Sequence, residues 1–202
     1  MRRFNITAGI VAILFCSPAL FSLTGDEAVE QFRGRMYRLE KMTGVISWTS
    51  LDGQSYSGSF KYLGPDKIYV KFTSPVNKIL VSNGRTLWIY SPGAGICGTQ
   101  ELEQGTTSGG IAWLVAGYEG IASEGDTGYT IKLKNDARTY REIILSVDKT
   151  FFIKGAILKR EDGRIMSFSI IDASTEADVN PDLFNFKVPK GVKIVNNPVN
   201  VR

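Results

Sequence analysis

The chain has 202 residues, of which 43% are hydrophobic and 22% are charged, proportions typical of a folded domain with a sizeable core. Its formal net charge is +4 and falls to +2 once Arg2 and Arg3 are removed with a leader segment. So weak and scattered a basic excess argues against nucleic acid as a partner. The chain has no histidine, which excludes His-dependent triads and removes the commonest metal ligand. We therefore expect no catalytic activity, no cofactor and no metal site.

The first residues are typical of an export signal. A basic start at Arg2 and Arg3 precedes an apolar stretch, and small residues such as Ala19 and Ser22 follow it. We expect residues 1–22 to be removed as a signal peptide, which leaves residues 23–202 as a single exported domain. A retained membrane anchor is the alternative, but the apolar run is short and interrupted by a proline.

A helix is predicted over residues 26–42, because apolar residues recur there at spacings of three and four. Thr24 or Asp26 could cap its start, and Gly44 would end it. The helix has one apolar stripe, so it should lie against another element. That stripe consists of Val29, Phe32, Met36 and Leu39.

From Val45 onward the hydrophobic period becomes two, which is typical of strands with one buried face. Turn signals such as Asp52-Gly53 and Asn83-Gly84 separate the alternating segments, so we predict a meander of antiparallel strands. The predicted strands cover residues 45–49, 59–62, 67–72, 78–82, 86–90, 129–133, 142–147, 152–159 and 165–171.

Three segments do not fit the meander. The Gly-, Thr- and Ser-rich stretch over residues 93–110 is either a mobile loop or contains a short helix near residues 100–104. Residues 111–118 are apolar on nearly all sides, which predicts a short buried helix or plug. The tail makes a turn at residues 180–184 and then runs extended over residues 185–195.

The predicted elements lead to one architecture. A large antiparallel sheet with one apolar face needs helices to cover that face, and a long meander tends to curl. The predicted fold class is mainly β (α+β), with a curved antiparallel sheet that forms an unclosed half-barrel covered by a few helices.

Residues 57–92 carry the most specific pattern in the chain, SGSFKYLGPDKIYVKFTSPVNKILVSNGRTLWIYSP. It contains a T-x-P element at 73–75, an ILVS-N-G-R-T-LW strand pair at 79–88 and a Y-x-P end at 90–92. A second match, F-x-F-x-x-P-x-G-V, ends the chain's last block at residues 184–192. In these elements the sequence strongly resembles the periplasmic outer-membrane lipoprotein carriers, the LolA-like family.

The resemblance implies a periplasmic carrier that catalyses no bond change. It would take acylated lipoproteins from an inner-membrane ATP-driven release complex, hide their acyl chains and deliver them to an outer-membrane acceptor. We expect it to act as a monomer. Members of the family carry an arginine before the proline of the strand-joining turn, and this arginine helps to close a lid. Gly64 stands at that position here, so either other groups hold the lid or the cavity is regulated differently.

The residues that would line the cavity follow from the alternation of the strands. Each methylene group taken from water is worth about 0.8 kcal/mol, so acyl chains need an apolar surface for cover. Alternating apolar positions by themselves are typical of a sealed core, and the family resemblance is what favours a cavity. The predicted cavity residues are Ile46, Trp48, Phe60, Tyr62, Ile68, Val70, Phe72, Ile79, Val81, Leu87 and Ile89. The predicted lid residues, in a Gly-flanked apolar segment whose alternative is a plain surface loop, are Trp113, Leu114 and Val115.

Other functions stay open beside the carrier. The same fold could serve a lipid- or lipoprotein-sensing regulator, although such proteins usually add a second domain. It could also carry other lipids, since any acyl chain suits the same cavity. An enzyme is the weakest alternative, because no acidic pair shares a motif and Cys97 has no neighbouring base in the sequence.

Overall fold

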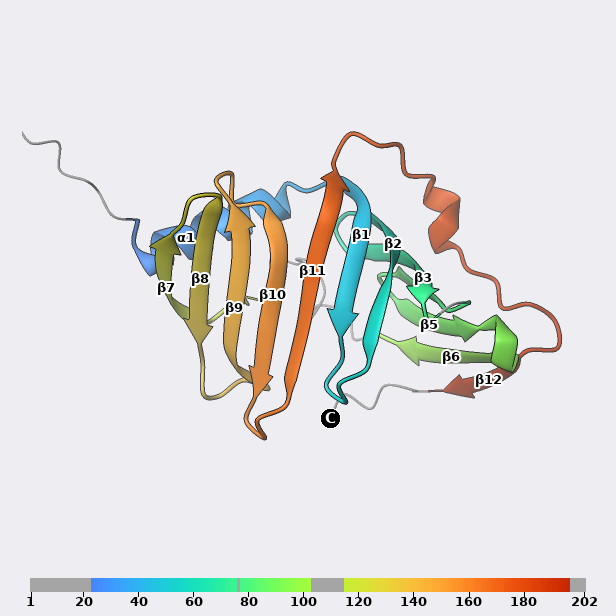
Figure 1. Ribbon diagram of the computed structural model, residues 1–202. Coiled ribbons are helices and arrows are strands. Elements are labelled where there is room, and N and C mark those ends of the chain that lie inside the picture. The colour runs from blue at the N-terminus through green and yellow to red at the C-terminus, as the bar shows by residue number, and fades with distance from the viewer. Residues whose placement is uncertain (1–22, 76, 103–114, 197–202) are drawn as a thin grey trace, which may run out of the picture.

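The computed structural model describes residues 23–75, 77–102 and 115–196 (Figure 1). Its first element is helix α1 (Gly25–Tyr37). Thr24 caps this helix with a capping box, in which the Thr24 hydroxyl accepts from the Glu27 amide and the Glu27 carboxylate accepts from the Thr24 amide. The prediction that Thr24 could cap the helix is confirmed.

One sheet of twelve strands forms the rest of the fold, in the order β12-β6-β5-β4-β3-β2-β1-β11-β10-β9-β8-β7. Neighbouring strands are antiparallel, except that β12 runs parallel to β6. The strands are β1 (Lys41–Thr49), β2 (Ser55–Leu63), β3 (Lys67–Ser74), β4 (Ile79–Asn83), β5 (Thr86–Ser91), β6 (Ile96–Glu101), β7 (Glu119–Glu124), β8 (Gly128–Lys134), β9 (Tyr140–Asp148), β10 (Ile153–Arg160), β11 (Ile165–Ser174) and β12 (Lys193–Asn196).

The sheet is strongly bent and its two edges do not meet. In Figure 1 strands β7 to β11 stand upright, whereas β5 and β6 run across the view, so the sheet turns sharply around β1 to β3. We call β7–β11 the helix half and β1–β6 the tail half. The predicted fold, an unclosed curved antiparallel sheet in a mainly β protein, is confirmed.

The predicted helix was too long at its C-terminal end. α1 ends at Tyr37, and Lys41 and Met42 already belong to β1. Met42 continues the apolar spacing of the helix, but it lies opposite Tyr62 of β2 in a nine-residue antiparallel pairing. Pairing along the whole strand outweighs helical periodicity at this boundary. Gly44 is therefore a residue inside the strand and not a helix end.

Two strands were missing from the prediction. β6 occupies part of the stretch predicted as a loop or short helix, and its Gly- and Thr-rich sequence is held by pairing with both β5 and β12. β7 follows at the far edge of the sheet, where polar residues give it little alternation. Half of the predicted apolar plug at residues 111–118, namely residues 111–114, lies outside the described residues.

The main core fills the helix half of the sheet. We define the inner face of the sheet as the face that α1 covers. α1 packs against β7 and β8, and the approach is close because a side chain at Gly25 would overlap the Gly120 carbonyl. The inner-face side chains of β8, β9 and β10 are fully buried under it, namely Ile131, Leu133, Ile143, Leu145 and Leu158.

The tail, residues 175–196, covers part of the opposite face of the other half, over β3, β4 and β5. After β11 the chain passes over the tail half, forms the short helix η3 (Pro181–Phe184) against β3 and β4, and ends as β12 beside β6 (Figure 1). η3 occupies the segment predicted as a turn. Phe184 is buried there, and the Phe186 ring lies 6.1 Å from that of Trp88 and 5.7 Å from that of Tyr90. Over β4 to β6, the tail half thus carries apolar side chains on both faces.

Candidate functional site

The register of the strands brings most of the predicted cavity residues onto the inner face. Phe60 lies opposite Val70, Tyr62 opposite Ile68, and Gly58 opposite Phe72. On the neighbouring strands Ile46 and Trp48 face Gly58 and Tyr56, and Leu87 and Ile89 continue the same face on β5. Residues predicted from separate strands therefore form one continuous apolar surface.

The predicted positions of Ile79 and Val81 are wrong. In β4 it is Leu80 that lies opposite Val70 on the inner face, whereas Val81 lies opposite Tyr69 and Ile79 opposite Lys71 on the outer face. The sequence Ile79-Leu80-Val81 is apolar throughout, so alternation could not assign its faces. Val81 is fully buried because the tail covers it from outside, which is a tertiary contact that no local pattern indicates.

The inner face also includes residues that the sequence analysis missed. Leu80, Tyr56, Met166, Phe168 and Ile170 join the predicted set, as their cross-strand partners show. The signal for β11 was present, since Met166, Phe168 and Ile170 alternate with polar or exposed residues. This strand lies outside the family pattern of residues 57–92, from which most of the predicted cavity residues come.

Burial differs between the two halves of the inner face. In the helix half the inner-face side chains of β8, β9 and β10 are sealed under α1, whereas a band over β1 to β5 and β11 is half-buried. α1 makes its contacts with β7 and β8, away from this band. The half-buried band comprises Ile46, Trp48, Tyr56, Ile68, Leu80, Leu87, Ile89, Met166 and Phe168.

Three aromatic rings form a row across β1, β2 and β3 at one end of the band. The Trp48 and Tyr56 rings stack with centroids 5.1 Å apart, and Phe72 meets Tyr56 edge-on at 5.6 Å. The Lys78 ammonium lies 5.5 Å from the centroid of the Tyr56 ring. This row is a rigid apolar wall with a cation at its outer end.

Two buried polar atoms on this face have no hydrogen-bond partner among the described residues. They are the indole nitrogen Nε1 of Trp48, which is a donor, and Oε1 of Gln100, which is an acceptor opposite Leu87. Buried polar atoms are rarely left unpaired in folded proteins. An ester or amide carbonyl of a bound molecule could accept from the indole, whereas only an amide N–H could donate to Gln100 Oε1.

A hollow of about 360 Å³ lies on the outer face of the sheet. Its floor consists of small side chains of β1, β10 and β11, among them Ser47, Gly155, Ser167 and Ser169, with Lys154 at the side. Hydroxyl groups and a cation make it unsuitable for acyl chains. The apolar inner face is the better candidate site.

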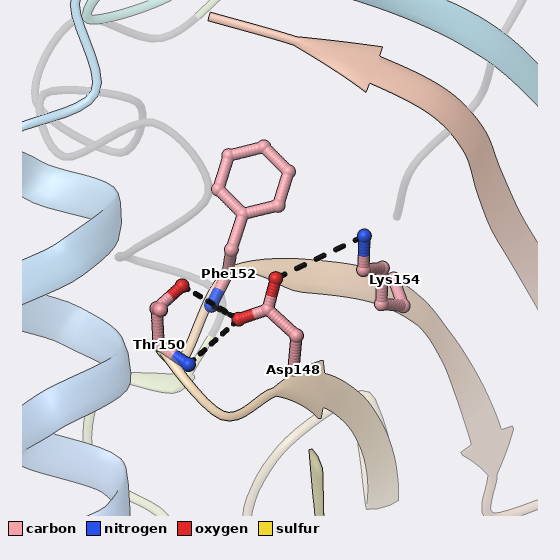
Figure 2. A network of polar contacts seen from close by, with 4 residues as sticks. All are labelled: Asp148, Thr150, Phe152 and Lys154. Carbon is pink, nitrogen blue, oxygen red and sulfur yellow. Dashed lines mark hydrogen bonds and ion pairs between the residues drawn. The ribbon is translucent and has the colours of Figure 1, made fainter. Parts of the chain in front are cut away.

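The hairpin between β9 and β10 fixes the end of α1 to the sheet. The Asp148 carboxylate accepts hydrogen bonds from the Thr150 amide (2.8 Å), the Thr150 hydroxyl (2.7 Å) and the Phe152 amide (3.0 Å), as Figure 2 shows. Burial raises the pKa of Asp148, but these bonds and the Lys154 ammonium outweigh it and leave the pKa below its usual value. The Phe152 ring is thereby held in the core, where the Arg35 guanidinium lies 5.3 Å above it.

Neither a metal site nor a membrane-spanning helix is found in the part of the chain that the structure describes. No group of three or more His, Cys, Asp or Glu side chains there could hold a metal ion. α1, at 13 residues, is too short to cross a bilayer. Cys97 is a free thiol that burial makes less acidic, because it raises the pKa of the group.

Comparison with known proteins adds the decisive observation. Residues 47–187 match the family described as Outer membrane lipoprotein carrier protein LolA. The chain belongs to this family. The outer-membrane lipoprotein carrier protein of Haemophilus ducreyi is 23% identical over 94% of this chain and 95% of its own, and that of Shewanella woodyi is 29% identical over 73% of each chain. The matched region contains almost all of the half-buried band.

Solved structures support the fold of this LolA-family chain. An uncharacterized conserved protein from Thermus thermophilus superposes with a TM-score of 0.56 at 12% identity, over 85% of this chain and 98% of that one. A chain of the MucA/MucB complex of Pseudomonas aeruginosa gives a TM-score of 0.53 at 12% identity, over 79% of this chain and 60% of that chain. At these identities the likeness concerns the fold alone.

The family's arginine position is occupied here by a glycine in a tight site. The Gly64 amide donates to the Glu40 carbonyl at 2.7 Å, and a Cβ atom at Gly64 would lie only 2.6 Å from the Leu39 carbonyl oxygen. Beside it the Tyr62 hydroxyl donates to the Pro65 carbonyl at 2.6 Å. In this LolA-family member the turn is therefore fixed by backbone contacts at the position where the resemblance implied an arginine.

Of the predicted lid, Val115 lies within the described residues, and Trp113 and Leu114 lie outside them. Val115 is buried in the main core. The residues that follow it are tied to the β8–β9 hairpin: the Tyr118 hydroxyl donates to the Tyr140 carbonyl (2.6 Å) and the Asn135 amide group to the Gly117 carbonyl (2.6 Å). Whether residues 113–115 act as a lid stays a prediction.

Proposed function

We propose that this protein is a periplasmic carrier that holds the acyl chains of lipoproteins against the half-buried band of its inner face. The band itself is the observation that carries the proposal: a continuous apolar surface whose side chains are neither sealed under α1 nor fully in water. The function of the family, an outer membrane lipoprotein carrier, supports the same conclusion.

The energetics favour such a use of the band. Each methylene group of an acyl chain gains about 0.8 kcal/mol on leaving water, so several chains together give a strong driving force for binding. The half-buried side chains gain as well, because the cargo covers the part of their surface that still meets water. The unpaired Trp48 indole can donate to an ester or amide carbonyl of the cargo, and the unpaired Gln100 carbonyl can accept from an amide N–H. The two atoms lie on β1 and β6, so different parts of the cargo would meet them.

A pair of matched substitutions tests the proposal. Leu87→Glu places a carboxylate in the band, whereas Ile171→Glu makes the same kind of change on the outer face, where Ile171 is 55% exposed. The probe is a fluorescent triacylated lipopeptide, and its binding to the mature protein is measured by anisotropy. We expect Leu87→Glu to weaken binding at least tenfold, because a buried carboxylate costs several kcal/mol, and Ile171→Glu to bind as the unaltered protein does.

Two outcomes would contradict the proposal. Equal binding by Leu87→Glu and the unaltered protein would show that the inner face does not hold the acyl chains. Equal weakening by both substitutions would show that the loss reflects charge or stability and not the site. Mass spectrometry of material that co-purifies with the protein from the periplasm separates the cargo classes: lipoproteins support this carrier, and free lipids alone point to a carrier of other lipids or a sensor.

The partners of the proposed carrier follow from the family. It would receive lipoproteins from an inner-membrane ATP-driven release complex and pass them to an outer-membrane acceptor, acting as a monomer without catalysis. Residues 1–22, which lie outside the described residues, would act as a signal peptide and direct the protein to the periplasm.

A further inference from the structure

Four lysines converge on the outer face of the tail half. Lys61 of β2 lies opposite Thr43 of β1 and Tyr69 of β3. Its diagonal neighbours on the same face are therefore Lys41 on one side and Lys67 and Lys71 on the other, each about 7 Å away by the usual geometry of antiparallel pairs. We call these four residues, Lys41, Lys61, Lys67 and Lys71, the lysine cluster.

In the helix half, by contrast, basic side chains form ion pairs with carboxylates. There Lys149 pairs with Glu124, Lys159 with Glu142, and Arg141 with Glu161, each at 2.6 Å. Lys132 and Lys134 lie close enough to Glu142 to help lower the pKa of its carboxyl, after the leading contribution of the Lys159 hydrogen bond. Among the described residues, by contrast, no ion pair is formed by Lys61, Lys67 or Lys71.

Among the described residues, the cluster's one carboxylate contact comes from the tail, just after β11. As the tail leaves β11, the Asp178 carboxylate lies 3.6 Å from the Lys41 ammonium, which also donates to the Glu176 carbonyl at 3.3 Å. An acidic chain therefore already rests against one corner of the cluster. The other three lysines are like charges on one face, which is unfavourable unless an anion lies between them.

The spacing of the lysines fits an extended acidic chain. In a strand-like peptide every second side chain points the same way, about 6.8 Å from the last. This repeat is close to the diagonal spacing of the cluster. Because the cluster is on the outer face, a chain bound there would leave the half-buried band of the inner face open to cargo.

We propose that the lysine cluster is a docking surface for an extended acidic segment of a partner protein. The surface works by charge complementarity and is separate from the apolar inner face. The inference goes beyond the carrier function, and it does not depend on which cargo the inner face holds.

The test uses the mature protein and a fluorescein-labelled peptide of alternating glutamate and serine, with a glutamine–serine peptide as the neutral control. We expect the acidic peptide to bind at low salt, to dissociate at high salt, and to bind at least tenfold more weakly to the triple variant Lys61→Gln, Lys67→Gln, Lys71→Gln. The matched control is Lys132→Gln, Lys134→Gln, Lys154→Gln, which removes three exposed lysines of the helix half. It should bind the acidic peptide as the unaltered protein does.

Three results would overturn the proposal. One is equal loss of peptide binding in the two triple variants, since net charge alone would then explain it. Another is failure of the unaltered protein to bind the acidic peptide better than the neutral one. The third is cluster-dependent binding to phosphatidylcholine vesicles that contain phosphatidylglycerol, with none to the peptide, because the surface would then recognise lipid headgroups. Binding of the triple variant to the triacylated lipopeptide is measured in parallel. This measurement distinguishes a loss of acidic-peptide binding from a loss of the carrier function.

Discussion

At the residue scale, Gly64 lies in a turn that has no room for a side chain. Its amide bonds to the Glu40 carbonyl, and the Leu39 carbonyl occupies the space where a Cβ atom would lie. An arginine at this position, which the resemblance implied, would require the segment before β1 to move away. The glycine and the close approach of that segment are therefore linked features of this chain.

Substitution of Gly64 by alanine should lower the free energy of unfolding by about 1–3 kcal/mol, the usual cost of forcing extra atoms into a packed site. Gly93→Ala is the matched control, because a Cβ atom there would meet nothing within 4 Å. Urea unfolding monitored by tryptophan fluorescence measures both variants. A Gly64→Ala variant as stable as Gly93→Ala would contradict the close approach.

The ionisation of the Tyr62 phenol gives a second prediction at the residue scale. Burial, followed by the nearby Asp66 carboxylate, raises the pKa of Tyr62 to about 12. Between pH 10 and pH 12 the unfolded chain would lose this phenolic proton while the folded protein keeps it, so stability falls as the pH rises through this window, by up to about 3 kcal/mol. Burial also raises the pKa of Tyr118 and Tyr140, which act in the same direction.

The variant Tyr62→Phe should therefore lose less stability than the unaltered protein between pH 10 and pH 12, as measured by denaturant unfolding at each pH. Tyr37→Phe is the control, because Tyr37 is 76% exposed. A Tyr62→Phe variant with an unchanged pH slope would show that Tyr62 ionises as readily in the folded protein as in the unfolded chain.

At the scale of elements, the tail acts as the cover of the tail half's outer face. Phe184 is 1% exposed, and Val81 and Cys97 below the tail are fully buried. β12 is held by a four-residue parallel pairing with β6, and all four of its residues are exposed. The tail is thus anchored by one buried aromatic residue and a short strand, which is a weak attachment compared with the long pairings elsewhere.

Substitution Phe184→Ala should release the tail before the rest of the protein unfolds. We expect the Cys97 thiol to react much faster with a chromogenic disulfide reagent in this variant, because the loss of a buried phenylalanine costs about 3–5 kcal/mol locally. Ile131→Ala, in the core of the helix half, is the control of similar size. Equal acceleration of thiol labelling in both variants would mean that Cys97 is exposed by global unfolding alone.

At the scale of the whole molecule, the two halves differ in how they are closed. The helix half has its inner face sealed by α1, with Ile131, Leu133, Ile143 and Leu145 fully buried. The tail half is partly covered from outside by the tail, and its inner face keeps the half-buried band beside buried residues such as Phe60 and Val70. A protein that must accept and release apolar cargo needs this division, since one half gives stability and the other gives access.

Hydrogen exchange should reveal this division. Amides of β8 and β9 are expected to exchange most slowly, and those of β4 and β5 faster, because their side chains are less buried on the inner face. Addition of a triacylated lipopeptide should slow exchange in β4 and β5 and leave β8 and β9 unchanged. Uniform protection over both halves, with or without lipopeptide, would contradict the division.

Local patterns predicted much of the fold and part of the site. The helix start at Thr24, the hairpins at Asp52-Gly53 and Asn83-Gly84, and most strands follow from capping, turn chemistry and a period of two. The inner-face positions of β1, β2, β3 and β5 follow from the same alternation. The boundary of α1 did not follow, because Met42 suits a helix as well as it suits the strand that β2 holds in place.

The sequence by itself determined a β meander with one apolar face, a capped amphipathic helix, and the family to which the chain belongs, because these depend on residues close together in the chain. The tertiary structure alone decided that Val81 faces the tail and that β6 is a strand, since both depend on contacts with β12 and η3 about a hundred residues away. It also decided that four lysines from three strands share one surface. Pairing register fixes such neighbours, and no local pattern encodes it where both faces of a strand are apolar or both are polar.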